Sequence, residues 1–108
     1  MLRKSRRLTS AEVAEVLKLG KAASSGPIRI KYTPCKPGAA TSQFSVVVSK
    51  KIKKLAVDRN RLRRQMFAVL KNIKPPFLVE AVVFITLSSI KQKDMGVALE
   101  GAFSKMHR

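Results

Sequence analysis

A dense group of basic side chains lies in the middle of this 108-residue chain. Eight of the fifteen residues from Lys50 to Arg64 are lysine or arginine, and Asp58 is the only acid among them. A guanidinium group can grip a phosphate through two parallel hydrogen bonds and can stack on a base, whereas an ammonium group acts as a point charge. The segment therefore predicts binding to nucleic-acid phosphates, through Lys50, Lys51, Lys53, Lys54, Arg59, Asn60, Arg61, Arg63 and Arg64.

The alternative for this segment is an ordinary solvated helix face. Such a face usually interleaves acids with bases at i,i+4 spacing, which relieves repulsion between like charges. The whole chain instead carries 23 Lys and Arg against 6 Asp and Glu, a formal charge of +17. This imbalance favours a polyanionic partner, and release of that partner's counterions predicts binding that weakens steeply with salt.

Two residues of the segment keep alternative roles. Asn60 either reads a base edge or a sugar hydroxyl, or it holds the local backbone. Asp58 is expected to cap the helix or to pair with Arg61, because a single carboxylate makes no metal site.

The chain shows no pattern of a hydrolytic site. A hydrolase needs a nucleophile, a general base or a metal cluster, and two-metal cleavage needs several converging carboxylates. The six acids are scattered, and His107 is the single histidine. We expect no catalytic residue, no metal or cofactor bound by the protein alone, and no small-molecule substrate.

Helical periodicity predicts a rigid element from about Leu55 to Asn72 that turns the basic residues outward. Its apolar residues fall within one arc at 3.6 residues per turn and should face the core. They are Leu55, Leu62, Met66, Val69 and Ile73. Arg64 and Lys71 then lie on the opposite side, and the prolines at 75–76 end the helix.

A capping box predicts a first helix, because Thr9 precedes Glu12 by three residues. This helix should end at Gly20, and a loop should follow over residues 21–27. Alternating or continuous apolar runs predict strands at about 28–33, 43–49 and 78–87, and a last helix should begin at Ser88 or Ser89.

The order α-β-β-α-β-α predicts an α/β (α+β) two-layer sandwich, with helices packed on a small mixed sheet. The length fits one domain over residues 1–108, with a basic, flexible arm at 1–8. No apolar run approaches the roughly 18 to 20 residues that a spanning helix needs, and the N-terminus lacks a secretory signal. The single cysteine, Cys35, is compatible with a reducing cytoplasm.

The segment from Val48 to Arg64, VSKKIKKLAVDRNRLRR, closely resembles the basic signature of the protein subunit of bacterial ribonuclease P. That signature has a strand ending in Val-Ser-Lys-Lys, then Ala-Val, then Arg-Asn-Arg and two further basic residues. Weaker similarity extends along most of the chain. The resemblance implies a fold like the second domain of small-subunit ribosomal protein five, with a left-handed β-α-β crossover.

The resemblance also implies a role. The protein would help a catalytic RNA bind precursor tRNA and remove its 5′ leader, with Mg²⁺ held mainly by RNA. The basic residues named above would contact the catalytic RNA, and a cleft between the sheet and the first helix would hold the leader. Leader contacts are expected from Tyr32, Phe44 and Ser49, although both rings have core packing as an alternative.

Three positions depart from the family pattern. Val13 stands where the family often has an aromatic residue, and Gln65 and Phe67 stand where it commonly has arginine. Phe67 would either stack on RNA or pack against the last helix. The competing functions are a ribosomal or other structural RNA-binding protein and a non-specific DNA-compacting protein.

Overall fold

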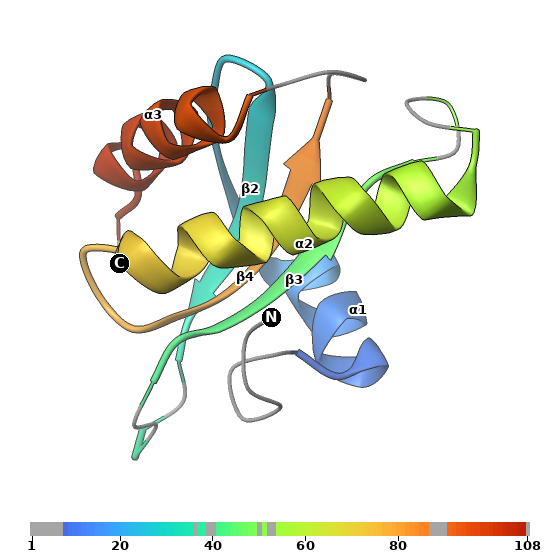
Figure 1. Cartoon of the computed structure of the whole chain (residues 1–108). Coiled ribbons are helices and arrows are strands. Elements are labelled where there is room, and N and C mark those ends of the chain that lie inside the picture. The colour runs from blue at the N-terminus through green and yellow to red at the C-terminus, as the bar shows by residue number, and fades with distance from the viewer. Residues whose placement is uncertain are drawn as a thin grey trace.

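The computed structural model describes residues 8–35, 37–38, 41–49, 51, 54–86 and 91–107. Three helices and four strands form this part of the chain (Figure 1). In chain order they are α1 (Ser10–Leu19), β1 (Lys21–Ser25), β2 (Ile28–Pro34), β3 (Gln43–Val47), α2 (Ala56–Asn72), β4 (Val79–Ile85) and α3 (Gln92–Ser104).

The four strands form one mixed sheet in the order β1-β2-β4-β3. The pairs β1–β2 and β2–β4 are antiparallel, whereas β3 and β4 are parallel and are joined through α2. The expected α+β class with a mixed sheet and a β-α-β crossover is therefore confirmed. The left-handed sense of the crossover stays a prediction, as does the likeness to the ribosomal domain.

The main core lies between one face of the sheet and the pair of helices α2 and α3. Every second side chain of β2 lies in this core, and so does every second side chain of β4. The other face of β4 carries Glu80, Val82 and Phe84, of which Val82 is fully buried and Glu80 is 7% exposed. This two-sided burial is the reason that β4 lies inside the sheet, as its sequence predicts.

Helix α1 contacts β2 and β4, and its buried Val16 lies outside the main core cluster, as does Val82. Since Val82 faces away from that core, α1 covers the other face of the sheet and adds a layer to the expected two. The predicted capping box is confirmed. The Thr9 N–H donates to Glu12 Oε1 at 2.9 Å, and the Glu12 N–H donates to Thr9 Oγ1 at 3.3 Å.

The predicted loop at 21–27 is wrong, because Lys21–Ser25 forms the edge strand β1. Its sequence, KAASS, has no β-branched or aromatic residue, and only Ala23 is buried. Pairing with β2 through a tight turn overrides this weak propensity. Gly26 has φ 54° in that turn, a left-handed conformation that glycine adopts without strain.

Other boundaries follow the sequence with small changes. Helix α2 begins at Ala56, and Leu55 precedes it with 65% of its surface exposed, so its expected place in the core is wrong. The last helix, α3, begins at Gln92, and the expected start at Ser88 or Ser89 lies outside the described residues. The arm at 1–8 lies outside the described residues except for Leu8, whose N–H donates to the Phe44 carbonyl at 3.0 Å.

Gly20 has no room for a side chain where α1 turns into β1. A Cβ there would press on the Val16 carbonyl and would lie 3.1 Å from both the N and the O of Tyr32. Because backbone atoms cannot move aside, Gly20→Ala should lower the free energy of unfolding by about 1–3 kcal/mol. Thermal denaturation followed by circular dichroism measures the change.

The matched control for this experiment is Gly96→Ala in α3. A Cβ at Gly96 would lie 3.5 Å from Ile73 Cδ1, an ordinary van der Waals separation. Alanine should therefore stabilise the protein there by about 0.5–1 kcal/mol through its higher helix propensity. Equal stabilities for the Gly20 variant and the wild type would contradict the close packing at this corner.

Candidate nucleic-acid interface

Helix α2 is anchored through one side. Its buried residues are Leu62, Met66, Phe67, Val69 and Leu70, and Ile73 packs against the same cluster just past the helix end. Phe67 is 8% exposed, so most of its ring lies in the core, and its remaining surface lines a groove beside β3. The helix is therefore a fixed platform, and the orientation of its remaining side chains follows from this anchoring.

The first turn of α2 follows a lysine-rich loop. Lys51 and Lys54 are exposed, whereas Lys50 and Lys53 lie outside the described residues. Arg59 reaches back to this loop, where its Nη1 donates to the Lys54 carbonyl at 2.8 Å. The side chain of the N-cap residue, Leu55, makes no capping hydrogen bond. Free N–H groups at a helix start favour an anion, so they add to the attraction of the lysines.

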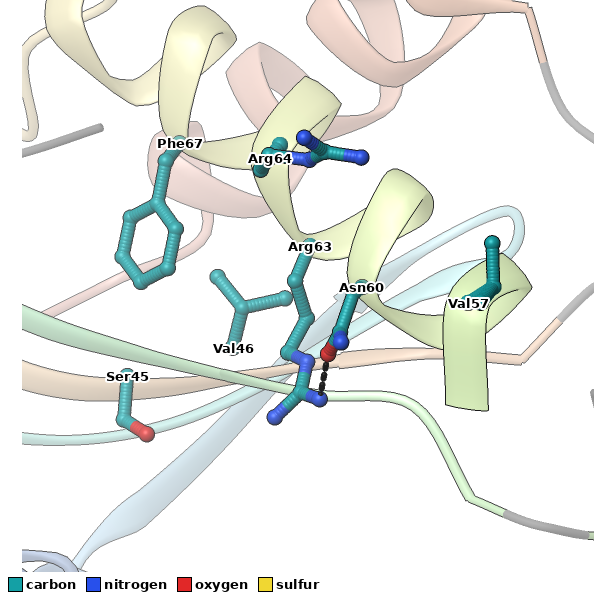
Figure 2. A pocket seen from close by; sticks show the side chains of 7 residues that line it. All are labelled: Ser45, Val46, Val57, Asn60, Arg63, Arg64 and Phe67. Atoms are coloured by element: carbon teal, nitrogen blue, oxygen red, sulfur yellow. Dashed lines mark hydrogen bonds between the residues drawn. The ribbon is translucent and has the colours of Figure 1, made fainter. Parts of the chain in front are cut away.

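Asn60 and Arg63 interact directly. The Arg63 guanidinium donates from Nη2 to Asn60 Oδ1 (Figure 2). From the sequence alone, Asn60 could either recognise a base edge or a sugar hydroxyl, or hold the local backbone. In the structure the Asn60 amide oxygen accepts from a neighbouring arginine, as the i,i+3 spacing on a helix permits, and its contact with RNA stays a prediction.

Arg61 and Arg64 both lie at the solvent-facing side of α2, and both are exposed. Neither side chain makes a hydrogen bond or an ion pair with another residue in the described part of the chain. Asp58, the only acid nearby in sequence, is not paired with Arg61 and does not cap α2. Both roles expected for Asp58 are therefore wrong, and the two guanidinium groups are left to an external anion.

A groove of about 540 Å³ runs between α2 and β3, the strand at the edge of the sheet. Ser45 and Val46 line it from β3, and the helix contributes Asn60, Arg63 and Arg64 (Figure 2). No acid is among the described residues that line the groove. Its cationic wall and hydroxyl-bearing floor suit a phosphate group of a nucleic-acid backbone.

Two of the expected leader contacts lie in the core. Tyr32 is 2% exposed and Phe44 is fully buried, on the sheet face that α2 and α3 cover. The Tyr32 hydroxyl accepts a hydrogen bond from the His107 N–H at 2.8 Å, and the Phe44 ring stacks with Phe103. Neither ring has a free face for a base, which favours the core alternative. Ser49 follows β3 and is exposed.

The other face of the sheet carries two cations and an aromatic ring that were not predicted as site residues. Arg29 and Lys31 alternate with the core residues of β2, and Phe84 alternates with the core residues of β4. These three side chains line a hollow of about 500 Å³. The period-2 pattern of β2 already placed its two cations on this face, but only the pairing of β2 with β4 brings Phe84 beside them.

Within the described residues, no group of three or more His, Cys, Asp or Glu side chains could hold a metal ion. Cys35 is partly buried, and burial, with a smaller effect of Glu80, raises the pKa of its thiol. A raised pKa keeps the thiol protonated and unreactive. No helix in the described part of the chain has the length and apolar character needed to cross a membrane.

The protein presents unpaired arginines on a helix that is packed on a small α+β fold, and its described residues contain no acid cluster. These features place it in the class of small nucleic-acid-binding proteins. The family model named Ribonuclease P matches residues 1–106, and the chain belongs to this family. A relative from Microcystis aeruginosa, called ribonuclease P protein component, is 44% identical over 41 residues. That alignment covers 38% of this chain and 34% of the relative.

The fold is shared with solved ribonuclease P proteins. The Thermotoga maritima protein has a TM-score of 0.80 and 21% identity, and the match covers 94% of this chain and 98% of that one. The Staphylococcus aureus protein has a TM-score of 0.78 and 16% identity, with 94% of each chain covered. At these identities the likeness concerns the fold.

The two unpaired arginines generate a prediction about salt dependence. Arg61→Ala and Arg64→Ala should each weaken binding to structured RNA and lower the slope of log K against log salt by about one, since each removes one phosphate contact. Lys18→Ala, on the exposed side of α1, removes the same charge away from α2 and should change the slope far less. Equal changes for all three variants would show that net charge alone drives binding.

Asn60→Ala should weaken RNA binding about fivefold without changing the salt slope, because Arg63 keeps its charge and loses its orienting partner. The loss should be uniform across RNA sequences. Asn72→Ala is the matched control, since the Asn72 side chain donates only to the Ala68 carbonyl of its own helix, at 3.3 Å. A loss confined to particular RNA sequences would instead assign Asn60 to base recognition.

Proposed function

We propose that this protein is the protein component of a bacterial ribonuclease P. It binds the catalytic RNA through the cationic side of α2 and assists RNA-catalysed, Mg²⁺-dependent removal of the 5′ leader from precursor tRNA in the cytoplasm. The observation that carries the proposal is the pair Arg61 and Arg64, accessible and unpaired among the described residues, on a helix fixed by its opposite side.

In this proposal the protein contributes binding and charge neutralisation, and the RNA contributes the chemistry. Two folded RNAs repel each other when they meet, and a protein with a formal charge of +17 lowers that repulsion. Mg²⁺ does the same work, so protein and metal should partly substitute for each other. The RNA subunit would hold the metal, and the described residues of the protein offer no three-ligand cluster for it.

The test is cleavage of precursor tRNA by a bacterial ribonuclease P RNA, with and without the full chain. At low Mg²⁺ the wild-type protein should raise the rate roughly tenfold or more, which corresponds to about 1.4 kcal/mol of added stabilisation. The stimulation should shrink at high Mg²⁺, and the double variant Arg61→Ala and Arg64→Ala should give less of it.

Absence of stimulation by the wild-type chain at every Mg²⁺ concentration would overturn the proposal and favour a ribosomal or other structural RNA-binding role. Matched-salt binding to duplex DNA and to structured RNA separates the remaining alternative. A DNA-compacting protein should bind both with equal affinity, whereas a ribonuclease P subunit should prefer the RNA.

A further inference from the structure

We propose that a hollow at the carboxyl end of α2 binds one unpaired nucleotide of the catalytic RNA. Lys71 and Lys74 would contact its phosphate, and Phe77 and Leu78 would pack against its base. The proposal rests on the function proposed above and adds to it a second RNA contact, away from the first turns of α2. In Figure 1 this hollow lies where the chain leaves the yellow end of α2 and turns back into β4.

Three segments of the chain meet at one end of the sheet and form this hollow. Its volume is about 450 Å³, and it is lined by the end of α2, by the residues before β3 and by those before β4. Because β3 and β4 are parallel, both strands start at this end, and Ser42 there contacts Val79, 37 residues further along the chain. The lining cations are Lys71 and Lys74, and the apolar lining is Pro75, Phe77 and Leu78.

Both lysines of the hollow are available for an anion. Lys71 and Lys74 are exposed, and neither side chain makes a hydrogen bond or an ion pair with another described residue. No acid is among the described residues that line the hollow. The carboxyl end of a helix carries about half a negative charge, which opposes an anion, but two ammonium groups supply two full positive charges. The net field in the hollow therefore favours a phosphate group.

A buried hydroxyl group in the lining lacks an acceptor. Ser42 is 4% exposed, and its Oγ accepts a hydrogen bond from the Val79 N–H at 3.0 Å. The Ser42 O–H donates to no other residue in the described part of the chain. A buried donor without a partner is unfavourable, and a phosphate oxygen of a ligand can accept from it. This donor distinguishes the hollow from an ordinary lysine-bearing surface.

The size and the apolar lining of the hollow select a nucleotide. A volume of about 450 Å³ lies in the usual range for small-ligand sites, so the hollow accepts one unpaired nucleotide but not a double helix. Unpaired RNA bases pack on aromatic and apolar side chains while nearby cations hold the backbone. Leu78 is 40% exposed, and a base that covers it removes this apolar surface from water.

The place of the hollow on α2 selects the catalytic RNA as the partner. Lys71 follows Arg64 by seven residues, which is almost two full turns, so both side chains leave the helix on the same side, about 10 Å apart along its axis. One RNA that contacts Arg64 can therefore reach the hollow. The cleft expected for the leader lies elsewhere, between the sheet and the first helix.

A single tryptophan can report on this hollow, because the chain contains none. The Cys35 N–H donates to the Leu78 carbonyl at 3.0 Å and holds the backbone there, so Leu78→Trp changes only the side chain that lines the hollow. The catalytic RNA should quench the fluorescence of this variant strongly, since a base stacks on the new ring. The control Val97→Trp puts tryptophan on α3 at a residue that is 66% exposed and should be quenched weakly.

Affinity measurements test the same site without a reporter. Leu78→Asp places a negative charge inside the hollow, where it repels a phosphate, and should weaken binding of the catalytic RNA about tenfold. Val97→Asp is the matched control, because it changes the net charge by the same amount on α3, and it should weaken binding far less. Circular dichroism and thermal denaturation of each variant establish that it is folded.

A free nucleotide is the other source of the same chemistry, and adenosine monophosphate is the probe for it. This compound should quench Leu78→Trp only at concentrations far above those of the RNA, because it lacks the contacts of the RNA with Arg61 and Arg64.

Three results would overturn the inference, even if the wild-type protein stimulates cleavage. They are a folded Leu78→Trp variant whose fluorescence the catalytic RNA does not quench, equal loss of affinity in Leu78→Asp and Val97→Asp, and quenching by adenosine monophosphate at concentrations as low as those of the RNA. The last result would assign the hollow to a free nucleotide. Failure of the proposed function has a different signature, since the wild-type chain would then give no stimulation of cleavage whatever the fluorescence shows.

Discussion

The burial of one side of α2 against the sheet is the interaction on which the rest of this structure depends. Leu62, Met66 and Leu70 are inaccessible or nearly so, and a fully buried side chain of this kind contributes about 1.5–3 kcal/mol. This anchoring fixes the rotation of the helix about its axis. Because the rotation is fixed, the arginines on the other side of the helix stay in water, where salt screens the repulsion between like charges.

The four arginines of α2 divide into two pairs with different surroundings. Arg59 and Arg63 donate to acceptors within the protein, the Lys54 carbonyl and the Asn60 amide, which orient their guanidinium groups. The side chains of Arg61 and Arg64 have no such contacts in the described part of the chain. Exposed charges are screened over about 8 Å at physiological salt, so this arrangement lowers stability little while it keeps a strong local field.

The sheet separates two environments. On one face, alternate residues of β2 and β4 close the core with α2 and α3, and Tyr32 and Phe44 are part of that core. On the other face α1 packs over Val82, and Arg29 and Phe84 remain accessible beyond it. Since successive side chains of a strand point to opposite faces, one register decides for every strand residue which environment it meets.

The sequence by itself determined the helical periodicity of α2, the capping box at Thr9, the central place of β4 and the uncompensated basic segment. These are local patterns, and local physics is enough to specify them. It did not determine β1, the exposure of Leu55, or the burial of Tyr32 and Phe44. Those outcomes depend on which strands pair and in which register, and a weak edge strand such as KAASS forms only because β2 is already there to bond it. The approach of Phe84 to Arg29 was decided in the same way, since residues far apart in the chain become neighbours only through the pairing of β2 with β4.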